Sequence, residues 1–154
     1  MTQPYNLTAN FDINLYSINA NAGPNGAVSP SGTLWVAHGG FTNIIITPDT
    51  NYHILDVGVD AASVGPTNNF AFANVTNGPH SLTASFAIDR YTLVVVSPHG
   101  VPVPWGVFTN DWNTPTNVYI LGSPEVIGMT QYVCTGWAAT GSAPPTGTGT
   151  NVAF

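Results

Sequence analysis

The sequence predicts an all-β protein made of two small tandem modules, β-sandwich-like or β-grasp-like, with an extra strand at the N-terminus. Three observations predict this class. Short alternating or β-branched runs are separated by turn residues, and 16 Gly and 13 Pro interrupt every stretch that could become a helix. A segment near the N-terminus recurs inside the chain. Hydrophobic residues make up 44% of the chain, which is too many for a disordered protein.

The recurring segment begins at Pro4 and again 75 positions later at Pro79, and Leu, Thr, Ala, Phe, Ile and Tyr then repeat in register. Inside the chain this segment closes one repeat and opens the next. At the N-terminus we expect no preceding repeat for it to close. The predicted divisions are therefore a donor-like strand over 1–14, a first module over 15–88 and a second module over 89–154.

Residues 5–13 alternate between apolar and polar side chains, which predicts a half-buried strand. Its apolar face would carry Leu7, Ala9, Phe11 and Ile13. Further strands of the first module are expected over residues 15–20, 34–36, 42–47, 52–59, 70–75 and 80–88. A tight hairpin is expected over 60–65. The run Ile44–Ile46 predicts burial on both faces or a covered edge.

In the second module we expect strands over residues 91–97, 105–109, 117–121, 130–138 and 151–154. Residues 99–104 are predicted to be a loop that cannot join a central sheet, because their prolines lack N–H donors. Residues 136–149 are predicted to form an irregular polar loop. Residues 151–154 resemble the end of a repeat, as in Leu82–Phe86.

Charge excludes several classes of partner. Only 5% of residues are charged, against roughly 25% in an ordinary soluble domain. Lysine is absent, Arg90 is the single strong cation and the net charge is −6. Such a chain has nothing with which to neutralise nucleic-acid phosphates or to form a polybasic membrane contact. No apolar run is long enough for membrane insertion. Cys134 is the single cysteine, so an intrachain disulfide is excluded and a buried thiol is favoured over interchain pairing.

Several separated motifs resemble the divergent internalin-type B-repeat of bacterial and archaeal surface proteins. They are Gly26–Gly32, Ile46–Asp60, Phe72–Thr76 and Leu82–Phe86. Residues 91–154 resemble a related surface repeat, through Tyr91–Leu93, Ser97–Gly100, Tyr132–Trp137 and Gly141-Ser142. The resemblance implies small all-β modules strung along secreted or cell-wall proteins, as spacers, adhesin stalks or assembly parts. It implies an extracellular or cell-surface location and no catalytic residues.

Candidate catalytic and metal-binding residues are sparse. His38, His53, His80 and His99 have no metal-like spacing to one another or to Cys134. Ser97, His99 and Asp111 are triad residue types without a nucleophile elbow, so we do not expect an enzyme. Asp56 and Asp60 are expected on one side of a strand with Asp49 near them in sequence, and such carboxylates could bind Ca²⁺. The alternative is a solvated strand face with turn caps, and no cofactor is expected.

Exposed aromatic residues and sequons suggest surface roles. Trp105 and Trp112 flank a loop and would suit an intersubunit contact. Together with Trp35, Trp137 and several tyrosines they could alternatively stack on surface glycans, although Trp137 and Tyr132 fit the second core better. Asn6 and Asn74 each begin an N-glycosylation sequon, which matters if the source cell glycosylates its surface proteins.

The functional prediction rests on the predicted strand over residues 5–13, which belongs to neither module. An unpaired amphipathic strand is an aggregation hazard unless another sheet receives it. We therefore expect a structural subunit of an extracellular filament or surface array, which binds other copies of itself head-to-tail by donor-strand addition. The alternatives are a spacer or stalk of a larger adhesin, with residues 4–13 paired inside the chain, or a carbohydrate-binding module.

Overall fold

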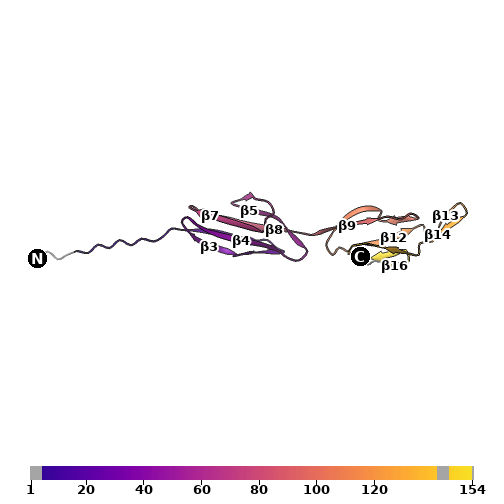
Figure 1. Cartoon of the computed structure of the whole chain (residues 1–154), viewed down its shortest axis with the longest axis horizontal. Coiled ribbons are helices and arrows are strands. Elements are labelled where there is room, and N and C mark those ends of the chain that lie inside the picture. The colour runs from indigo at the N-terminus through magenta and orange to yellow at the C-terminus, as the bar shows by residue number, and fades with distance from the viewer. Residues whose placement is uncertain (1–4, 142–145, 154) are drawn as a thin grey trace. The chain divides into compact units, whose positions relative to one another are not determined.

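The computed structural model describes residues 5–141 and 146–153. Within those ranges every regular element is a strand, which confirms the all-β prediction (Figure 1). No described segment is a helix of the length and apolarity needed to cross a membrane. The chain divides into two compact units, residues 1–88 (unit 1) and residues 89–154 (unit 2).

Unit 1 consists of eight strands in two sheets. They are β1 (Leu15–Ala22), β2 (Gly26–Ser29), β3 (Gly32–Ala37), β4 (Gly40–Pro48), β5 (Tyr52–Val59), β6 (Ala62–Ser63), β7 (Asn69–Val75) and β8 (His80–Ile88). One sheet has the order β3-β1-β8-β5-β6 and the other the order β2-β4-β7. β8 lies at the centre of the larger sheet, parallel to β1 and antiparallel to β5.

The core of unit 1 lies between the two sheets. Ile18, Leu82 and Val57 of the larger sheet are fully buried, as is Ile44 of the smaller one. Side chains alternate along each strand, so one face packs inward and the other faces solvent. The alternation corrects the prediction for Ile44–Ile46: Ile44 and Ile46 are buried, but Ile45 is 52% exposed.

Unit 2 consists of nine shorter strands. They are β9 (Arg90–Val95), β10 (Val101–Val103), β11 (Gly106–Asp111), β12 (Asn117–Leu121), β13 (Glu125–Ile127), β14 (Thr130–Tyr132), β15 (Gly136–Ala138), β16 (Thr146–Thr148) and β17 (Asn151–Ala153). Three of them form a sheet of order β10-β12-β17, and the rest pair as β9-β11, β13-β14 and β15-β16. Among the described residues of this unit, Val118, at 7% exposure, and Pro102 are buried.

Three expectations about single segments were wrong. Residues 5–13 form no strand within the described chain. Val101–Val103 do join a sheet, as its edge strand β10. An edge strand tolerates Pro102, because one side of it has no neighbouring strand that would need a proline N–H. Part of the loop predicted over 136–149 is the β15–β16 hairpin.

Candidate assembly site

The N-terminal segment, residues 5–13, exposes an apolar face to solvent. Leu7 is 98% exposed, Phe11 90% and Ile13 64%, and Ala9 is also exposed. None of these nine residues joins a ladder or makes a hydrogen bond with another described residue, and the segment carries no strand arrow in Figure 1. The first backbone bond of this region comes at the next residue, where the Asn14 carbonyl accepts from His38 N–H at 2.9 Å.

The second copy of this sequence, β8, is the most enclosed strand of unit 1. Leu82 is 0% and Ala84 3% exposed, and they match Leu7 and Ala9 of the N-terminal segment. Phe86, which matches Phe11, packs against the core and over Gly26, where an added methyl group would overlap the ring. Two similar segments, which share Leu, Thr, Ala, Phe and Ile in register, are therefore a central strand at one place and an exposed single segment at the other.

Unit 2 repeats the strand order of unit 1 through most of its length. β9 pairs with β11 as β1 pairs with β3, and both pairs are antiparallel. The sheet β10-β12-β17 matches β2-β4-β7. The β15–β16 hairpin matches the β5–β6 hairpin, since Gly149 N–H donates to Thr135 as Val64 N–H donates to Val57. β13–β14 is an additional hairpin of unit 2.

Residue registers support this correspondence. In β1–β3 the partner of Ala20 is Gly32, and in β9–β11 the partner of Val95 is Gly106. Both glycines have positive φ, 83° and 97°, a conformation that costs glycine little, and each follows a Pro by two positions.

Buried pairs agree as well. Val28 lies opposite Ile46 in unit 1, and Pro102 lies opposite Ile120 in unit 2. Val28 and Pro102 are both buried, as are Ile44 and its counterpart Val118.

Unit 2 has no described strand in the position of β8. The C-terminal residues 151–153 form β17, which pairs with β12 in the place of β7, so their predicted likeness to Leu82–Phe86 was wrong. Phe154 lies outside the described residues. Among the described strands, β9 pairs with β11 alone and β15 with β16 alone, so no described strand pairs with the other edge of either.

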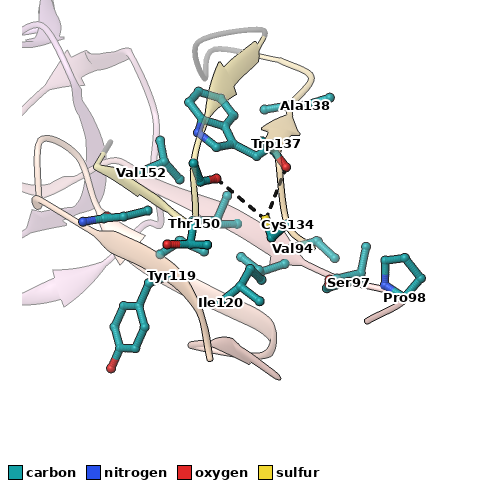
Figure 2. Close-up of a pocket in the computed structure, with 18 of the residues that line it drawn as sticks. Val94, Ser97, Pro98, Tyr119, Ile120, Cys134, Trp137, Ala138, Thr150 and Val152 are labelled. Atoms are coloured by element: carbon teal, nitrogen blue, oxygen red, sulfur yellow. Dashed lines mark hydrogen bonds between the residues drawn. The ribbon is translucent and has the colours of Figure 1, made fainter. Parts of the chain in front are cut away.

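The unpartnered edges border a groove, here called the unit 2 groove. It has a volume of about 590 Å³, and it is lined by residues 92–98, 118–120, 134, 136–140 and 149–152. In Figure 2, Cys134 lies between the strand of Trp137 and the segment that leads to Thr150. Its thiol is half-buried rather than buried, and it lies 3.6 Å from the Gly136 carbonyl and 3.7 Å from that of Gly149. None of the lining side chains is charged.

A second cavity of about 240 Å³ shares Ser97, Pro98, Ile120, Cys134 and Gly136 with the groove. It extends to Gly100, the counterpart of Gly26 in the β2–β10 correspondence. Sequence reasoning missed both cavities. The shared Pro-x-Gly spacing at 30–32 and 104–106 was the signal from which they could have been found.

The two tryptophans predicted for contacts are exposed but separate. Trp105 is 74% and Trp112 48% exposed, and they stand just outside the two ends of β11. At about 3.3 Å per residue they are roughly 20 Å apart along the strand, too far for one stacking platform. Tyr132, which was expected in the second core, is 37% exposed and stacks on the His99 ring with centroids 3.6 Å apart.

Two of the carboxylates considered for Ca²⁺, Asp56 and Asp60, accept hydrogen bonds from protein groups. Asp56 accepts from the Ser63 hydroxyl at 2.7 Å. Asp60 lies beyond β5 in a turn with φ 48°, rather than on the strand with Asp56. It accepts from His80 Nδ1 at 2.7 Å and from Ser81 N–H at 2.8 Å. The His80 hydrogen bond, followed by the Ser81 N–H, lowers the pKa of the Asp60 carboxyl. Over residues 5–141 and 146–153, no three His, Cys, Asp or Glu residues are grouped as a metal site would require.

The triad residue types do not converge. Ser97 Oγ donates to the His99 backbone carbonyl at 2.6 Å rather than to its ring. His99 Nδ1 lies 3.1 Å from Glu125, and Asp111 pairs with Arg90 at 3.1 Å. The Ser97–His99 contact is a loop hydrogen bond, and it has no nucleophile–base geometry.

Both sequon asparagines are accessible. Asn6 is exposed on the N-terminal segment, and Asn74 is exposed in β7 with φ 52°. Their exposure would allow glycan attachment at either site.

No family model matches the chain, and neither the curated proteins nor the solved structures contain a significant match to it. The functional interpretation below therefore depends on this chain's own sequence and geometry.

Proposed function

We propose that this chain is a structural subunit that assembles with copies of itself head-to-tail, by adding its N-terminal segment to a neighbouring sheet. The observation that carries the proposal is the exposure of residues 5–13, whose sequence elsewhere forms the central strand β8. The product is an extracellular filament or surface array. A binding role of this kind requires neither a cofactor nor catalytic residues.

The exposed face supplies the energy for such a contact. Burying a Leu, Phe or Ile side chain contributes about 1.5–3 kcal/mol each. Strand addition supplies backbone hydrogen bonds along the full length of the segment, while the alternating side chains fill pockets. Because donor and acceptor are different surfaces, the contact is heterologous, and it extends into a filament when its rotation does not close.

The composition supports assembly outside the cell. Few charges oppose the stacking of identical subunits. The Thr-, Asn-, Gly- and Pro-rich sequence, the two exposed sequons and the resemblance to surface repeats favour an extracellular or cell-surface location.

Two double variants test the proposal. One places two negative charges on the apolar face of the segment, and the other places two on its polar face. Leu7→Asp with Phe11→Asp removes the two most exposed of the three large apolar side chains, and we expect the concentration needed for assembly to rise more than hundredfold. Asn6→Asp with Thr8→Asp adds the same charge on the polar face and should have a much smaller effect. Sedimentation and electron microscopy measure both variants.

Deletion of residues 1–13 completes this experiment. We expect the shortened chain to stay monomeric, because the segment is exposed and unit 1 does not need it to fold. Undiminished filaments after the deletion would overturn the proposal. A wild-type chain that is monomeric at all concentrations would favour the spacer or stalk module of a larger adhesin.

A carbohydrate-binding module is the other competing function, favoured by the exposure of Trp35 and Trp105, which are 64% and 74% exposed. Quenching of tryptophan fluorescence by glycans, lost in Trp35→Ala or Trp105→Ala, would support it.

A further inference from the structure

We propose that the acceptor is the unit 2 groove, and that residues 5–13 of a second copy enter it as the strand that corresponds to β8. This inference rests on the proposed function and adds the place and register of the contact. Two independent observations meet here. The described part of unit 2 lacks one strand of the unit 1 topology, and the N-terminal segment repeats the sequence of that strand.

The β8 ladders define the expected register. β8 runs parallel to β1 with Leu82 opposite Ala20. Leu7 corresponds to Leu82 and Val95 to Ala20, so Leu7 lies opposite Val95 in the complex. The incoming strand runs parallel to β9, beginning near Leu93 and leaving past Ser97.

Burial in unit 2 agrees with a strand being added there. Ile18 and Ala20 of β1 are 0% exposed, whereas their counterparts Leu93 and Val95 are only half-buried. The residues are equally apolar, and the difference is the neighbouring strand that covers β1 and not β9. Leu7 and Ala9 would cover Leu93 and Val95 as Leu82 and Ala84 cover Ile18 and Ala20.

Phe11 matches the second cavity. Phe86 of β8 packs over Gly26. Any side chain at position 26 would overlap the Phe86 ring. Phe11 corresponds to Phe86 and Gly100 to Gly26 by position in the strand order, and Gly100 lines the second cavity. The two glycines differ in conformation, because Gly100 has φ 67° and an added methyl group there would meet Ile120 and Leu121. The donor strand therefore runs from the larger cavity into the smaller one, with Phe11 at the far end.

Few charges lie at the contact. Residues 5–11 carry no charged side chain, and neither does the lining of the larger cavity. Asp12 of the segment and Glu125 of the smaller cavity are the two carboxylates near its far end. Both open edges, of β9 and of β15, can bond to the inserted backbone, which meets the requirement that buried N–H and C=O groups be paired.

The native cysteine allows a direct test. β5 pairs with β8 with Asp56 opposite Ser85. The match between the β15–β16 and β5–β6 hairpins makes Cys134 the counterpart of Asp56. The repeat between residues 5–13 and 80–88 makes Asn10 the counterpart of Ser85. Asn10→Cys should therefore place its sulfur within disulfide distance of Cys134 in the next copy, since opposed residues have Cα atoms about 4.5–5.5 Å apart.

Asn6→Cys is the matched control, because it is the same change on the same face but about 13 Å further along the strand. Mild oxidation of assembled Asn10→Cys protein should give a ladder of disulfide-linked oligomers on a non-reducing gel. Asn6→Cys should give less than a tenth as much, and Cys134→Ser should abolish the ladder. Both positions are exposed, so we expect neither change to disturb the fold.

The outcomes separate this inference from the proposed function. A missing Asn10→Cys ladder, while Leu7→Asp with Phe11→Asp still prevents assembly, would mean that the segment docks elsewhere and would overturn the groove assignment alone. Equal cross-linking from Asn6→Cys would overturn the register and with it the β8 correspondence. Undiminished assembly of the chain without residues 1–13 would overturn both proposals.

Discussion

Unit 1 and unit 2 share a strand order, but they differ in closure, that is, in whether a central strand joins the strand pairs into one sheet. In unit 1, β8 joins the β1–β3 pair to the β5–β6 hairpin and makes one five-stranded sheet. In unit 2, the corresponding pairs β9–β11 and β15–β16 remain separate sheets. In the described ranges, the largest fully buried side chains all belong to unit 1, and the buried residues of unit 2 are Val118, at 7% exposure, and Pro102.

In this chain, deep burial of apolar residues accompanies the central strand β8, which unit 1 has and the described part of unit 2 does not. Leu93 and Val95 are as hydrophobic as Ile18 and Ala20, so composition does not explain their exposure. An open sheet edge beside an apolar groove is an aggregation hazard in an isolated protein and a binding site in an assembling one. The same chain carries a segment with the missing strand's sequence.

The largest expected effect comes from truncating equivalent residues in the two units. Ile18→Ala should destabilise unit 1 by about 2–5 kcal/mol, because the side chain is fully enclosed. Leu93→Ala should cost less than half as much in the unassembled chain, and more once the groove is filled. Hydrogen exchange of β1 and β9, resolved by mass spectrometry, measures both. Equal costs in the unassembled chain would contradict the difference in closure.

A smaller effect tests whether the two units are counterparts. Gly32→Ala and Gly106→Ala place a side chain at positive φ, which should cost about 1 kcal/mol at each position. Neither added methyl group would meet a neighbour within 4 Å, so the backbone conformation alone sets the cost. Urea unfolding should give the same loss for both. A neutral result at one glycine would show that the two turns differ.

The smallest expected effect concerns acid and unit 1 alone. The pKa of Asp60 is lowered in the folded state, so its carboxylate stabilises unit 1 above its ordinary pKa. This stabilisation is lost as pH falls below about 4 and through the lowered pKa. Asp60→Asn should flatten the acid dependence of β5 and β8 protection while β9 and β12 are unchanged. An unaltered acid profile would show that the carboxyl contributes nothing.

Local patterns predicted the strands better than their partners. Alternation located β1, β4, β5, β7 and β8 to within a few residues, because one-sided burial has a period of two. The triple isoleucine was misjudged, since hydrophobicity alone does not reveal that Ile45 faces solvent. Asp56 and Asp60 were placed on one side of a strand because their even spacing fits the period of two, but Asp60 belongs to the turn that follows β5. Cys134 was expected to be buried because the sequence does not show that its unit lacks a covering strand.

The amino-acid sequence by itself determined that the chain is all-β and that residues 5–13 repeat a strand found elsewhere in it. Both are properties of local periodicity and of direct comparison along the chain. Only the tertiary structure decided that residues 151–153 pair as β7 does, that Cys134 lines a groove and that β9 keeps an open edge. Strand pairing joins residues far apart in sequence, and the alternation of side chains specifies which face is buried but not which strand lies alongside.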